Sequence, residues 1–261
     1  MTLTEGLILG AVQGLTEFLP VSSSGHLALA QQLMPGFEQP GLLFDVVLHL
    51  GTLVAVILYF RQDLKQLLTA PFRRDIQAVQ ERRYLRLLLV GSIPTAIIGL
   101  TFKETVEGLF HRPLVVGALL MVTGLLLFVA ERFRTSGRKR LTLGDSLLTG
   151  IAQGIAVLPG ISRSGATIAT LLLRGVEGQT AARFSFLLAL PAVGGAALLS
   201  LKDVEQLPSG EIVTYLAGAG IACLVGLISI HALLGIIRQK RLYYFALYCW
   251  LVGGAALYFF R

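Results

Sequence analysis

The sequence predicts an all-α, polytopic membrane protein organised as an inverted-topology repeat of two halves, each a re-entrant helix-loop-helix followed by three transmembrane helices. Three observations support this fold class. Hydrophobic residues make up 54% of the 261 residues and the mean hydropathy is +0.74, which is rare in a soluble domain. Apolar runs of roughly 17–20 residues, the length that crosses ~30 Å of hydrocarbon, recur along the chain. A polar, helix-breaking motif occurs twice, about 140 residues apart.

Six apolar runs are long enough to serve as membrane spans. They cover residues 44–60, 85–102, 114–130, 181–201, 212–237 and 242–260. The first segment carries Glu5 where a signal peptide has positive charge, so we expect no cleaved signal. Cys223 and Cys249 lie inside spans and indicate neither a disulfide framework nor a metal cluster. The net charge of +7 is typical of orientation signals in membrane proteins, so we expect no nucleic-acid partner.

The repeated motif is QGLTEFLPVSSSGH at residues 13–26 and QGIAVLPGISRSGA at residues 153–166. Each copy is an apolar run that breaks at Leu-Pro, opens into a Ser-rich turn and closes on Gly. Three long apolar spans follow each copy. We therefore interpret the chain as one integral membrane domain, residues 1–261, with a first repeat at 1–140 and a second repeat at 141–261.

The segments around the two motifs are too short to cross a bilayer. After Pro20 only residues 27–34 are apolar, and after Pro159 only residues 166–173. About eight residues of helix rise roughly 12 Å. Each motif is therefore either a re-entrant hairpin or the break in one kinked spanning helix. Hairpins place 17 Lys and Arg on one side of the membrane and 4 on the other, whereas kinked spans give 14 and 7. Because basic loops concentrate on the cytoplasmic side, the hairpins are favoured.

Three crossings per half mean that the second half enters the membrane from the opposite face. The repeat is then inverted, both termini lie outside the cytoplasm, and the two hairpins dip in from opposite sides. Their tips would meet near the midplane, where non-helical backbone is tolerated only if it is buried in protein or lines a water-filled cavity. Two Ser-rich tips that face each other would form one polar site.

The first tip has the composition of a cation site. Gln13 and Glu17 are four residues apart and share one helix face. Two oxygen-bearing side chains on one face suit a hard cation such as Mg²⁺ or Ca²⁺. The remaining polar positions of this tip are Ser22, Ser23, Ser24, Gly25 and His26.

The second tip, Gly-Ile-Ser-Arg-Ser-Gly-Ala-Thr, has the composition of a phosphate site. It offers hydroxyl donors, free backbone N–H groups before a helix start, and a guanidinium fork. Its candidate binding positions are Gly160, Ser162, Arg163, Ser164, Gly165 and Thr167. A cation site opposite a phosphate site, with the imidazole of His26 between them, indicates phosphoryl-transfer chemistry in which His26 handles a proton or attacks.

Structural interpretations compete with these roles. Glu17 and Arg163 would also form an ion pair that only holds the tips together. The serines at 22–24 are typical N-cap residues for the short helix that follows. A single histidine in an apolar span is more often a hydrogen-bonded core residue than a functional one, and we assign His49 that structural role.

The stretches GLTEFLPVSSSGH and PGISRSGAT resemble the two signature motifs of the undecaprenyl-diphosphate phosphatase family of the bacitracin-resistance type. The resemblance covers essentially the whole chain, including its length and repeat layout. It implies a multi-pass enzyme of the bacterial inner (plasma) membrane that hydrolyses undecaprenyl diphosphate, a polyprenyl diphosphate, to the monophosphate and inorganic phosphate. This reaction recycles the lipid carrier for cell-wall synthesis. The resemblance also implies dependence on Mg²⁺ or Ca²⁺ and a site that faces the periplasm.

Residue by residue, the family's acidic motif falls on Gln13 and Glu17, which the resemblance makes metal ligands. Its other positions are Ser23, His26 and Arg163, with Ser162, Ser164 and Thr167 beside the arginine. Because the first acidic position is Gln13, which adds no charge, metal affinity would depend more on Glu17. The nucleophile stays open between water, Ser23 and His26; Ser23 or activated water is favoured, with His26 as the base.

The main alternative is a secondary transporter or flippase for a lipid phosphate, because inverted repeats with broken helices that meet at the midplane are typical of transporters. Such a protein would need the same anion site. A structural membrane scaffold would not need Glu, Arg and His at the tips. The expected partners are the lipid substrate and membrane lipids, and a homodimer is compatible with the sequence.

Overall fold

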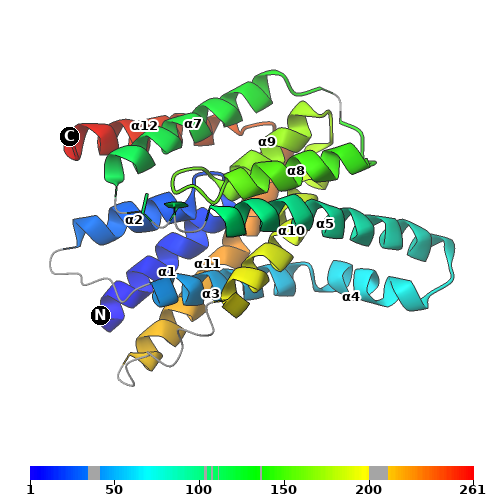
Figure 1. The fold of residues 1–261 in the computed structure, drawn as a ribbon, viewed down its shortest axis with the longest axis horizontal. Helices are drawn as coiled ribbons and strands as arrows, with labels where there is room; N and C mark the ends of the chain where they lie inside the picture. The colour runs from blue at the N-terminus through cyan, green and yellow to red at the C-terminus, as the bar shows by residue number, and fades with distance from the viewer. Residues whose placement is uncertain (35–41, 103–104, 107, 111, 136, 200–210) are drawn as a thin grey trace.

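The computed structural model describes residues 1–261 apart from 35–41, 103–104, 107, 111, 136 and 200–210. The helices of the first predicted repeat are α1 (Leu3–Phe18), α2 (Ser23–Leu33), α3 (Leu42–Tyr59), α4 (Arg61–Thr69), the 3₁₀ helix η1 (Ala70–Phe72), α5 (Ile76–Thr101) and α7 (Pro113–Arg132). Those of the second are α8 (Leu143–Ile155), α9 (Arg163–Leu173), α10 (Gly178–Leu199), α11 (Ile212–Arg238) and α12 (Tyr243–Phe259). The predicted all-α class is confirmed, and most helices run along the long axis of the molecule (Figure 1).

The helices that follow each hairpin have the length of membrane spans. Among the described residues, α5, α7, α10 and α11 are each long and apolar enough to cross a bilayer. α3 reaches that length together with α4, to which it is joined at a bend of 75°. α12 is apolar but has 17 residues, which is the lower limit for a span. The chain is therefore a multi-pass membrane protein, and α12 as a sixth span stays a prediction.

The basic segment after α3, expected to be a loop, is largely helical. α4 buries Leu67 against the bundle while Arg61 stays exposed, which is the pattern of an amphipathic surface helix. The carboxylate of Asp75 then caps α5 by accepting a hydrogen bond from the first turn of that helix at 2.9 Å. α5 consequently begins at Ile76, before the predicted start of its apolar run at residue 85.

Both predicted hairpins are present as pairs of short helices. α1 begins at a capping box formed by Thr2 and Glu5, and it ends before Pro20, whose ring cannot continue a helix. α8 begins at an equivalent capping box formed by Thr142 and Asp145. The local sequence thus sets the start of each hairpin in the same way.

The return helices of the hairpins both begin at a serine. Ser22 is the N-cap of α2 and Ser162 is the N-cap of α9, and each side chain accepts a hydrogen bond from a backbone N–H of the first turn. α2 and α9 have 11 residues each. Because such a helix rises only about 17 Å, neither one crosses a bilayer, as the sequence predicts.

Helices of each half pack mainly on helices of the other half. α1 lies along α11 and α8 lies along α5, so the first helix of each hairpin packs on the second long helix of the other half. These contacts are close at Gly10 and Gly150, because a Cβ there would clash with the carbonyl oxygens of Gly218 and Gly91, respectively. α7 packs on α12, and α3 packs on α10. This exchange is the pattern expected for two halves related by a two-fold axis.

The two hairpins extend toward opposite ends of the molecule. In Figure 1, α1 and α2 extend from the centre toward the left end, where both termini lie, and α8 and α9 extend toward the right. Other contacts join α4 to α10, where Arg183 pairs with Asp63, and the end of α7 to that of α11, where Arg134 donates to the carbonyl oxygen of Ile237. The arrangement is the one that an inverted repeat requires, while its orientation in a membrane and the repeat boundaries stay predictions. Lys103 and Lys202, two of the four Lys and Arg that the hairpin arrangement counts on the less basic side, lie outside the described residues.

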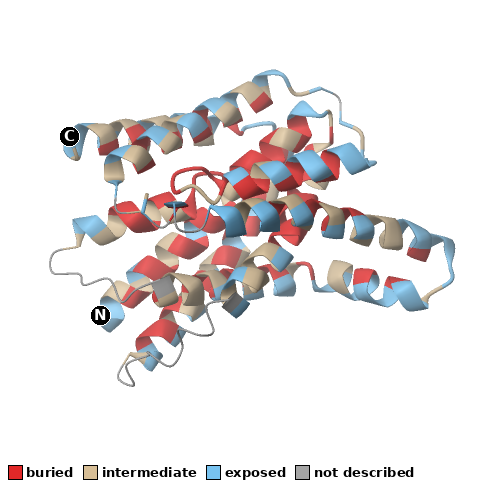
Figure 2. Cartoon of the chain, in the orientation of Figure 1, coloured by how far each residue is buried: buried red, intermediate tan, exposed pale blue. Residues whose placement is uncertain are grey.

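Buried side chains concentrate where the hairpins meet the long helices. The main apolar cluster includes Phe18 of α1, Ile168 of α9, and Phe184 and Leu188 of α10. Figure 2 shows this buried zone in red around α8 and α9, whereas the right-hand end near α4 is mostly exposed. The polar turns of the two motifs therefore lie in the most enclosed part of the bundle.

Candidate active site

The two Ser-rich turns meet at the centre of the bundle. The Oγ of Ser22 accepts a hydrogen bond from the backbone N–H of Gly160 at 3.1 Å, which joins the two turns. Ser22 has a φ of 71° and Gly160 a φ of 102°, and the left-handed region is uncommon for a serine. A Cβ on Gly25 would lie 3.1 Å from the Cα of Gly160, so the glycine lets the turns approach closely. The tips thus meet, as the sequence predicts.

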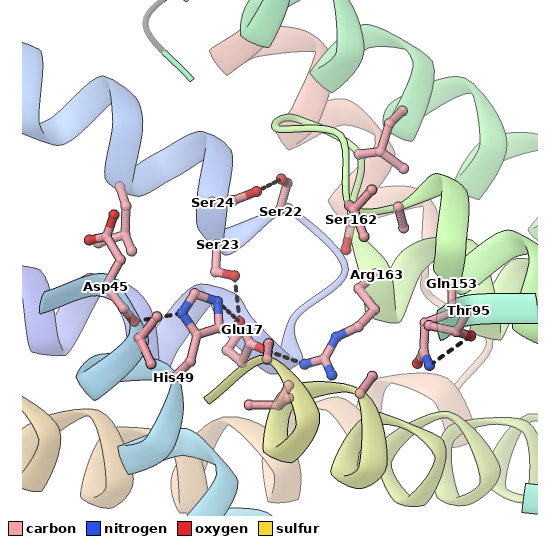
Figure 3. A pocket seen from close by; sticks show the side chains of 18 of the residues that line it. Glu17, Ser22, Ser23, Ser24, Asp45, His49, Thr95, Gln153, Ser162 and Arg163 are labelled. Carbon is pink, nitrogen blue, oxygen red and sulfur yellow. Dashed lines mark hydrogen bonds and ion pairs between the residues drawn. The ribbon is translucent and has the colours of Figure 1, made fainter. Parts of the chain in front are cut away.

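Glu17, near the end of α1, is the buried acid at this junction. Its Oε2 accepts hydrogen bonds from Gln13 Nε2 at 3.0 Å and from Ser23 Oγ at 2.5 Å. Its Oε1 accepts a hydrogen bond from Arg163 Nη2. The side chain is 4% exposed, and three elements of the hairpins converge on it (Figure 3). The guanidinium balances the buried charge, and the hydrogen bonds hold the carboxylate in one position.

Arg163 is the first residue of α9, and its guanidinium is only partly hydrogen-bonded. Its Nη2 pairs with Glu17, whereas its Nη1 is buried and has no hydrogen-bond partner. Leaving a charged donor buried and unpaired is costly, so such an atom points to a missing acceptor. Nη1 is therefore a buried donor without an acceptor, while Nη2 holds the acid.

A cavity of about 330 Å³ opens in front of these side chains. Its polar lining includes Glu17, the serines at 22–24, Ser162 and Arg163. Its apolar lining includes Ala156, Val157, Ala192, Val193, Ala196 and Ala197. Figure 3 shows Ser23 of the first turn and Arg163 of the second both pointing toward Glu17. One side of the cavity thus suits a charged group and the other an apolar chain.

Two helices begin at the cavity. The N-caps of α2 and α9, Ser22 and Ser162, both line it. A helix N-terminus carries partial positive charge and unpaired backbone N–H groups, both of which favour phosphate. Together with Arg163, the two N-termini give this side of the cavity its hydrogen-bond donors.

The structure separates His26 from this group, which corrects the predicted placement. The Nδ1 of His26 donates to the carbonyl oxygen of Ser22 at 2.8 Å, and its Nε2 lies 2.9 Å from the hydroxyl of Tyr248 in α12. The two rings stack with their centroids 5.5 Å apart. Among the described residues that line the cavity, His26 does not occur. α2 turns this imidazole toward α12, so it does not lie between the acid and the arginine.

The predicted phosphate-site residues divide into two groups. Ser22, Ser24, Ser162 and Arg163 line the cavity. The described residues that line it do not include Gly25, Gly160, Ser164, Gly165 or Thr167. Ser164 Oγ donates to the carbonyl oxygen of Leu19 at 3.3 Å, and Thr167 Oγ1 donates to that of Arg163 at 2.8 Å. The second group therefore shapes the turns and α9 and does not face the cavity.

Gln13 supports Glu17 from behind. Its amide nitrogen donates to the carboxylate, its Oε1 is buried without a hydrogen-bond partner, and the residue is fully buried. The residues that line the cavity, among those described, do not include Gln13. Its role as a metal ligand stays a prediction, and its amide oxygen is turned away from Glu17.

Two ionisable residues of α3 that the sequence did not assign to the site, Asp45 and His49, also line the cavity. His49 Nε2 lies 3.7 Å from Glu17 Oε2 (Figure 3). His49 is therefore not isolated from the site, whereas the structural role that we assigned to it stays a prediction. Asp45 and His49 are four residues apart in an apolar span, and that spacing would have placed both on one face of a membrane helix.

The residues at the junction fit a divalent cation that is held partly by the protein and partly by the phosphate oxygens of a bound substrate. Among the described residues, no group of three or more His, Cys, Asp or Glu side chains is arranged to bind a metal ion. Mg²⁺ is commonly held by one or two carboxylates together with substrate phosphates and water. Glu17, with a second carboxylate of the cavity lining at Asp45, provides such a setting.

The chain is similar to proteins of one family along nearly its whole length. The family described as "Bacitracin resistance protein BacA" matches residues 6–255. A protein of Syntrophotalea carbinolica named undecaprenyl-diphosphatase is 56% identical over 256 residues, which cover 97% of each chain. Proteins with that name from Desulforapulum autotrophicum and Methanosphaera stadtmanae are 45% and 42% identical, over 97% of this chain and 96% of each relative. The chain therefore belongs to the bacitracin resistance protein BacA family.

Proposed function

We propose that the protein is a membrane phosphatase that hydrolyses undecaprenyl diphosphate to undecaprenyl phosphate and inorganic phosphate. The observation that carries this proposal is the convergence of Glu17, Ser23 and Arg163 on one cavity between the two turns. The names of the similar proteins support the choice of substrate.

The cavity has separate places for the two parts of such a substrate. The diphosphate would lie against Arg163 Nη1 and the N-termini of α2 and α9, which supply donors and positive charge. The first units of the polyprenyl chain would lie against the small apolar side chains of α10, at residues 192–197. An apolar chain that reaches the bilayer through this side needs no polar partner.

Ser23 is the group best placed to attack. Its Oγ donates to Glu17 Oε2 at 2.5 Å, so Glu17 is positioned to take the proton as Oγ bonds to the terminal phosphorus. The bond between that phosphorus and the bridging oxygen breaks, and its electron pair leaves with the polyprenyl monophosphate. Water then hydrolyses the phosphoserine and releases phosphate. His26, the other protein nucleophile that the sequence allowed, lies on the far side of Ser22.

We extend the proposal to a divalent cation, Mg²⁺ or Ca²⁺, held at Glu17. When bound, the cation would neutralise charge on the phosphate oxygens. We also place the protein in the bacterial inner membrane with its site open to the periplasm, where it would regenerate the lipid carrier for cell-wall synthesis. The distribution of Lys and Arg supports this orientation.

The test is phosphate release from a polyprenyl diphosphate by the purified protein in detergent, with Mg²⁺ or with EDTA. We expect release with Mg²⁺, little release with EDTA, and none from the Ser23→Ala variant. A phosphoserine trapped by acid quenching would identify Ser23 as the nucleophile. A lipid transporter or flippase, the alternative that the broken helices allow, would bind the lipid and release no phosphate.

A further inference from the structure

A second hollow lies at the bend between α3 and α4, toward the end of the molecule opposite the two termini (Figure 1). Its volume is about 650 Å³, and none of the described residues that line it lines the candidate active site. The bend of 75° between the two helices opens this space, which we call the elbow groove. Its apolar lining comes from α3, α4 and α10: Leu53, Ile57, Leu64, Leu68 and Leu190.

The elbow groove also carries two cations. Arg61 and Lys65 both line it, both are exposed, and their spacing of four residues places them on one face of α4. The described lining contains no Asp or Glu, and the acid between them in sequence, Asp63, pairs with Arg183 of α10. Arg61 donates to the backbone carbonyl oxygen of Leu58 at 3.4 Å, and within the described part of the chain neither cation pairs with a carboxylate. The positive charge of the groove is therefore not neutralised by the protein.

Several contacts hold the bend in place. Leu67 of α4 is buried in the main apolar cluster. Arg82 of α5 donates to the carbonyl oxygens of Ala70 at 3.2 Å and of Arg73 at 2.7 Å, which holds η1 against α5. Because the groove is formed without a ligand, little ordering of the protein opposes binding.

Exposed apolar side chains at the bend indicate the depth of the groove in the membrane. Leu68, Phe72 and Ile76 occur every four residues and are 67%, 88% and 83% exposed. Large apolar side chains beside exposed cations are typical of a segment that lies between the headgroups and the hydrocarbon. α3 is apolar up to Tyr59, and the first charged residue after it is Arg61. These features place the cations at the level of the headgroups and the apolar lining toward the acyl chains.

We propose that the elbow groove binds an anionic phospholipid, with the phosphate between Arg61 and Lys65 and part of an acyl chain against Leu53, Ile57 and Leu190. A basic pocket beside membrane helices suits such a headgroup, and a guanidinium binds phosphate oxygens well. A zwitterionic lipid would bring an ammonium group to two cations without an acid, so charge selects against it. The inference does not depend on the proposed phosphatase function, because the groove and the candidate active site share no described lining residue.

The probe is phosphatidylglycerol, titrated into the full-length protein in detergent and compared with phosphatidylcholine of the same acyl chains. Native mass spectrometry gives the dissociation constant of the first bound lipid. We expect phosphatidylglycerol to bind at least about fivefold more tightly, and Arg61→Gln/Lys65→Gln to reduce this preference to less than about twofold. The matched control is Arg74→Gln/Arg86→Gln, which removes the same charge from exposed positions near the bend that do not line the groove, and it should keep the preference.

A second variant tests the apolar part of the site without changing its charge. Ile57→Trp would fill the groove beside α3 and should weaken phosphatidylglycerol binding by at least about threefold. If Arg61→Gln/Lys65→Gln does not fold, a photoactivatable phosphatidylglycerol added to the wild type still decides. Its cross-links should map to the α3 and α10 residues of the groove, and cross-links confined to other helices would contradict the proposal.

Four results would overturn the proposal. Equal affinity for the two phospholipids would exclude selection by charge, and an equal loss in the control variant would mean diffuse attraction to the basic end of the molecule. Displacement of the lipid by inorganic phosphate, with no effect of Ile57→Trp, would identify a simple anion site. Tighter binding of a polyprenyl monophosphate than of phosphatidylglycerol would assign the groove to that lipid.

Discussion

Glu17 is contacted by side chains from three other helices, α2, α3 and α9. A carboxylate in this position does two things. It holds Ser23 and Arg163 at fixed places, and it keeps a negative charge inside an otherwise apolar bundle, where an unpaired charge is costly. The ion pair that could have been only a structural contact therefore also sets the geometry of the cavity.

Arg163→Lys should keep the fold and lose kcat by at least ~10²-fold, which corresponds to about 2.7 kcal/mol. The planar fork lets Nη2 hold Glu17 while Nη1 binds a phosphate oxygen, and a single ammonium cannot take both positions. Arg163→Ala should lose more. The measurement is steady-state phosphate release at saturating Mg²⁺. Near-normal turnover in the lysine variant would mean that the charge alone is sufficient.

His26 should act by positioning the turn that carries Ser23. Its Nδ1 donates to the carbonyl oxygen of Ser22, whose positive φ needs support. We expect His26→Asn, which keeps a donor near the Nδ1 position, to retain turnover within about fivefold. His26→Gln should lose kcat by about tenfold or more through misplacement of Ser23, with little change in KM. Equal losses in both variants would instead indicate a direct role for the imidazole.

At the residue scale the sequence predicted the acid, the serine and the arginine but not their surroundings. The sequence was sufficient to single out Glu17 and Ser23, which lie in the first motif, and Arg163, which lies in the second. It could not show that α2 turns His26 toward α12, nor that α3 packs beside α1 with His49 facing the acid. Those placements depend on tertiary contacts between segments that share no motif.

At the element scale, the first helix of each hairpin packs closely against a long helix of the other half. Gly10→Val should separate α1 from α11, because any Cβ there clashes with the carbonyl oxygen of Gly218. We expect a loss of about 1–3 kcal/mol in stability together with reduced activity, since Glu17 is on the same helix. Gly220→Val on α11 is the matched control, because no atom lies within 4 Å of a Cβ at that position. Thermal unfolding in detergent compares the two, and equal melting temperatures would contradict the close contact.

Asp145 stabilises the end of the second hairpin that lies away from the Ser-rich turn. Its fully buried carboxylate accepts from Arg138 at 2.7 Å, Arg174 at 3.1 Å and the hydroxyl of Thr142 at 2.7 Å. Burial alone would raise the pKa of Asp145, but hydrogen bonds from Thr142 and Arg138 outweigh it and hold the pKa below its usual value. These contacts join the α7–α8 connection to the C-terminal end of α9.

Asp145→Asn should therefore lower stability at neutral pH by about 1–3 kcal/mol. Because the folded-state pKa of Asp145 is lowered, its contribution is present above the unfolded value of about 3.9 and is lost as the pH falls through the folded value. The difference in melting temperature from the wild type should thus shrink below about pH 4. Asp75→Asn, at an exposed cap, is the control and should change little. A difference that is independent of pH would contradict the charged contacts.

The sequence predicted the elements well where hydrophobic length decided them. Each long apolar run became one helix, and Pro20 and the Ser-rich turns ended the short ones. It missed α4 because an amphipathic surface helix of nine residues, rich in charge, looks like a basic loop. It also could not show which helices pair, since the exchange between halves depends on glycine contacts that periodicity does not report.

At the scale of the whole molecule, the exchanged pairing explains why two hairpins can share one site. Neither hairpin completes the cavity alone, because Glu17 and Ser23 come from the first and Ser162 and Arg163 from the second. The hairpins point toward opposite ends of the bundle, so their tips meet only if both halves are present and oppositely oriented (Figure 1). Formation of this cavity therefore depends on the opposite orientation of the two halves as well as on the residues that line it.

We expect both termini to lie outside the cytoplasm. Re-entrant hairpins leave 17 Lys and Arg in the connections on one side and 4 on the other, and basic connections stay in the cytoplasm. A reporter that is active only in the cytoplasm should be silent when fused after Arg261 and active when fused after Arg140 in the basic α7–α8 connection, which serves as the control. If the first hairpin crossed the membrane completely, the α7–α8 connection and the C-terminus would change sides relative to the N-terminus. A strong signal after Arg261 would therefore exclude two hairpins that enter the membrane from opposite faces. The meeting of the two tips would then need an explanation other than an inverted repeat.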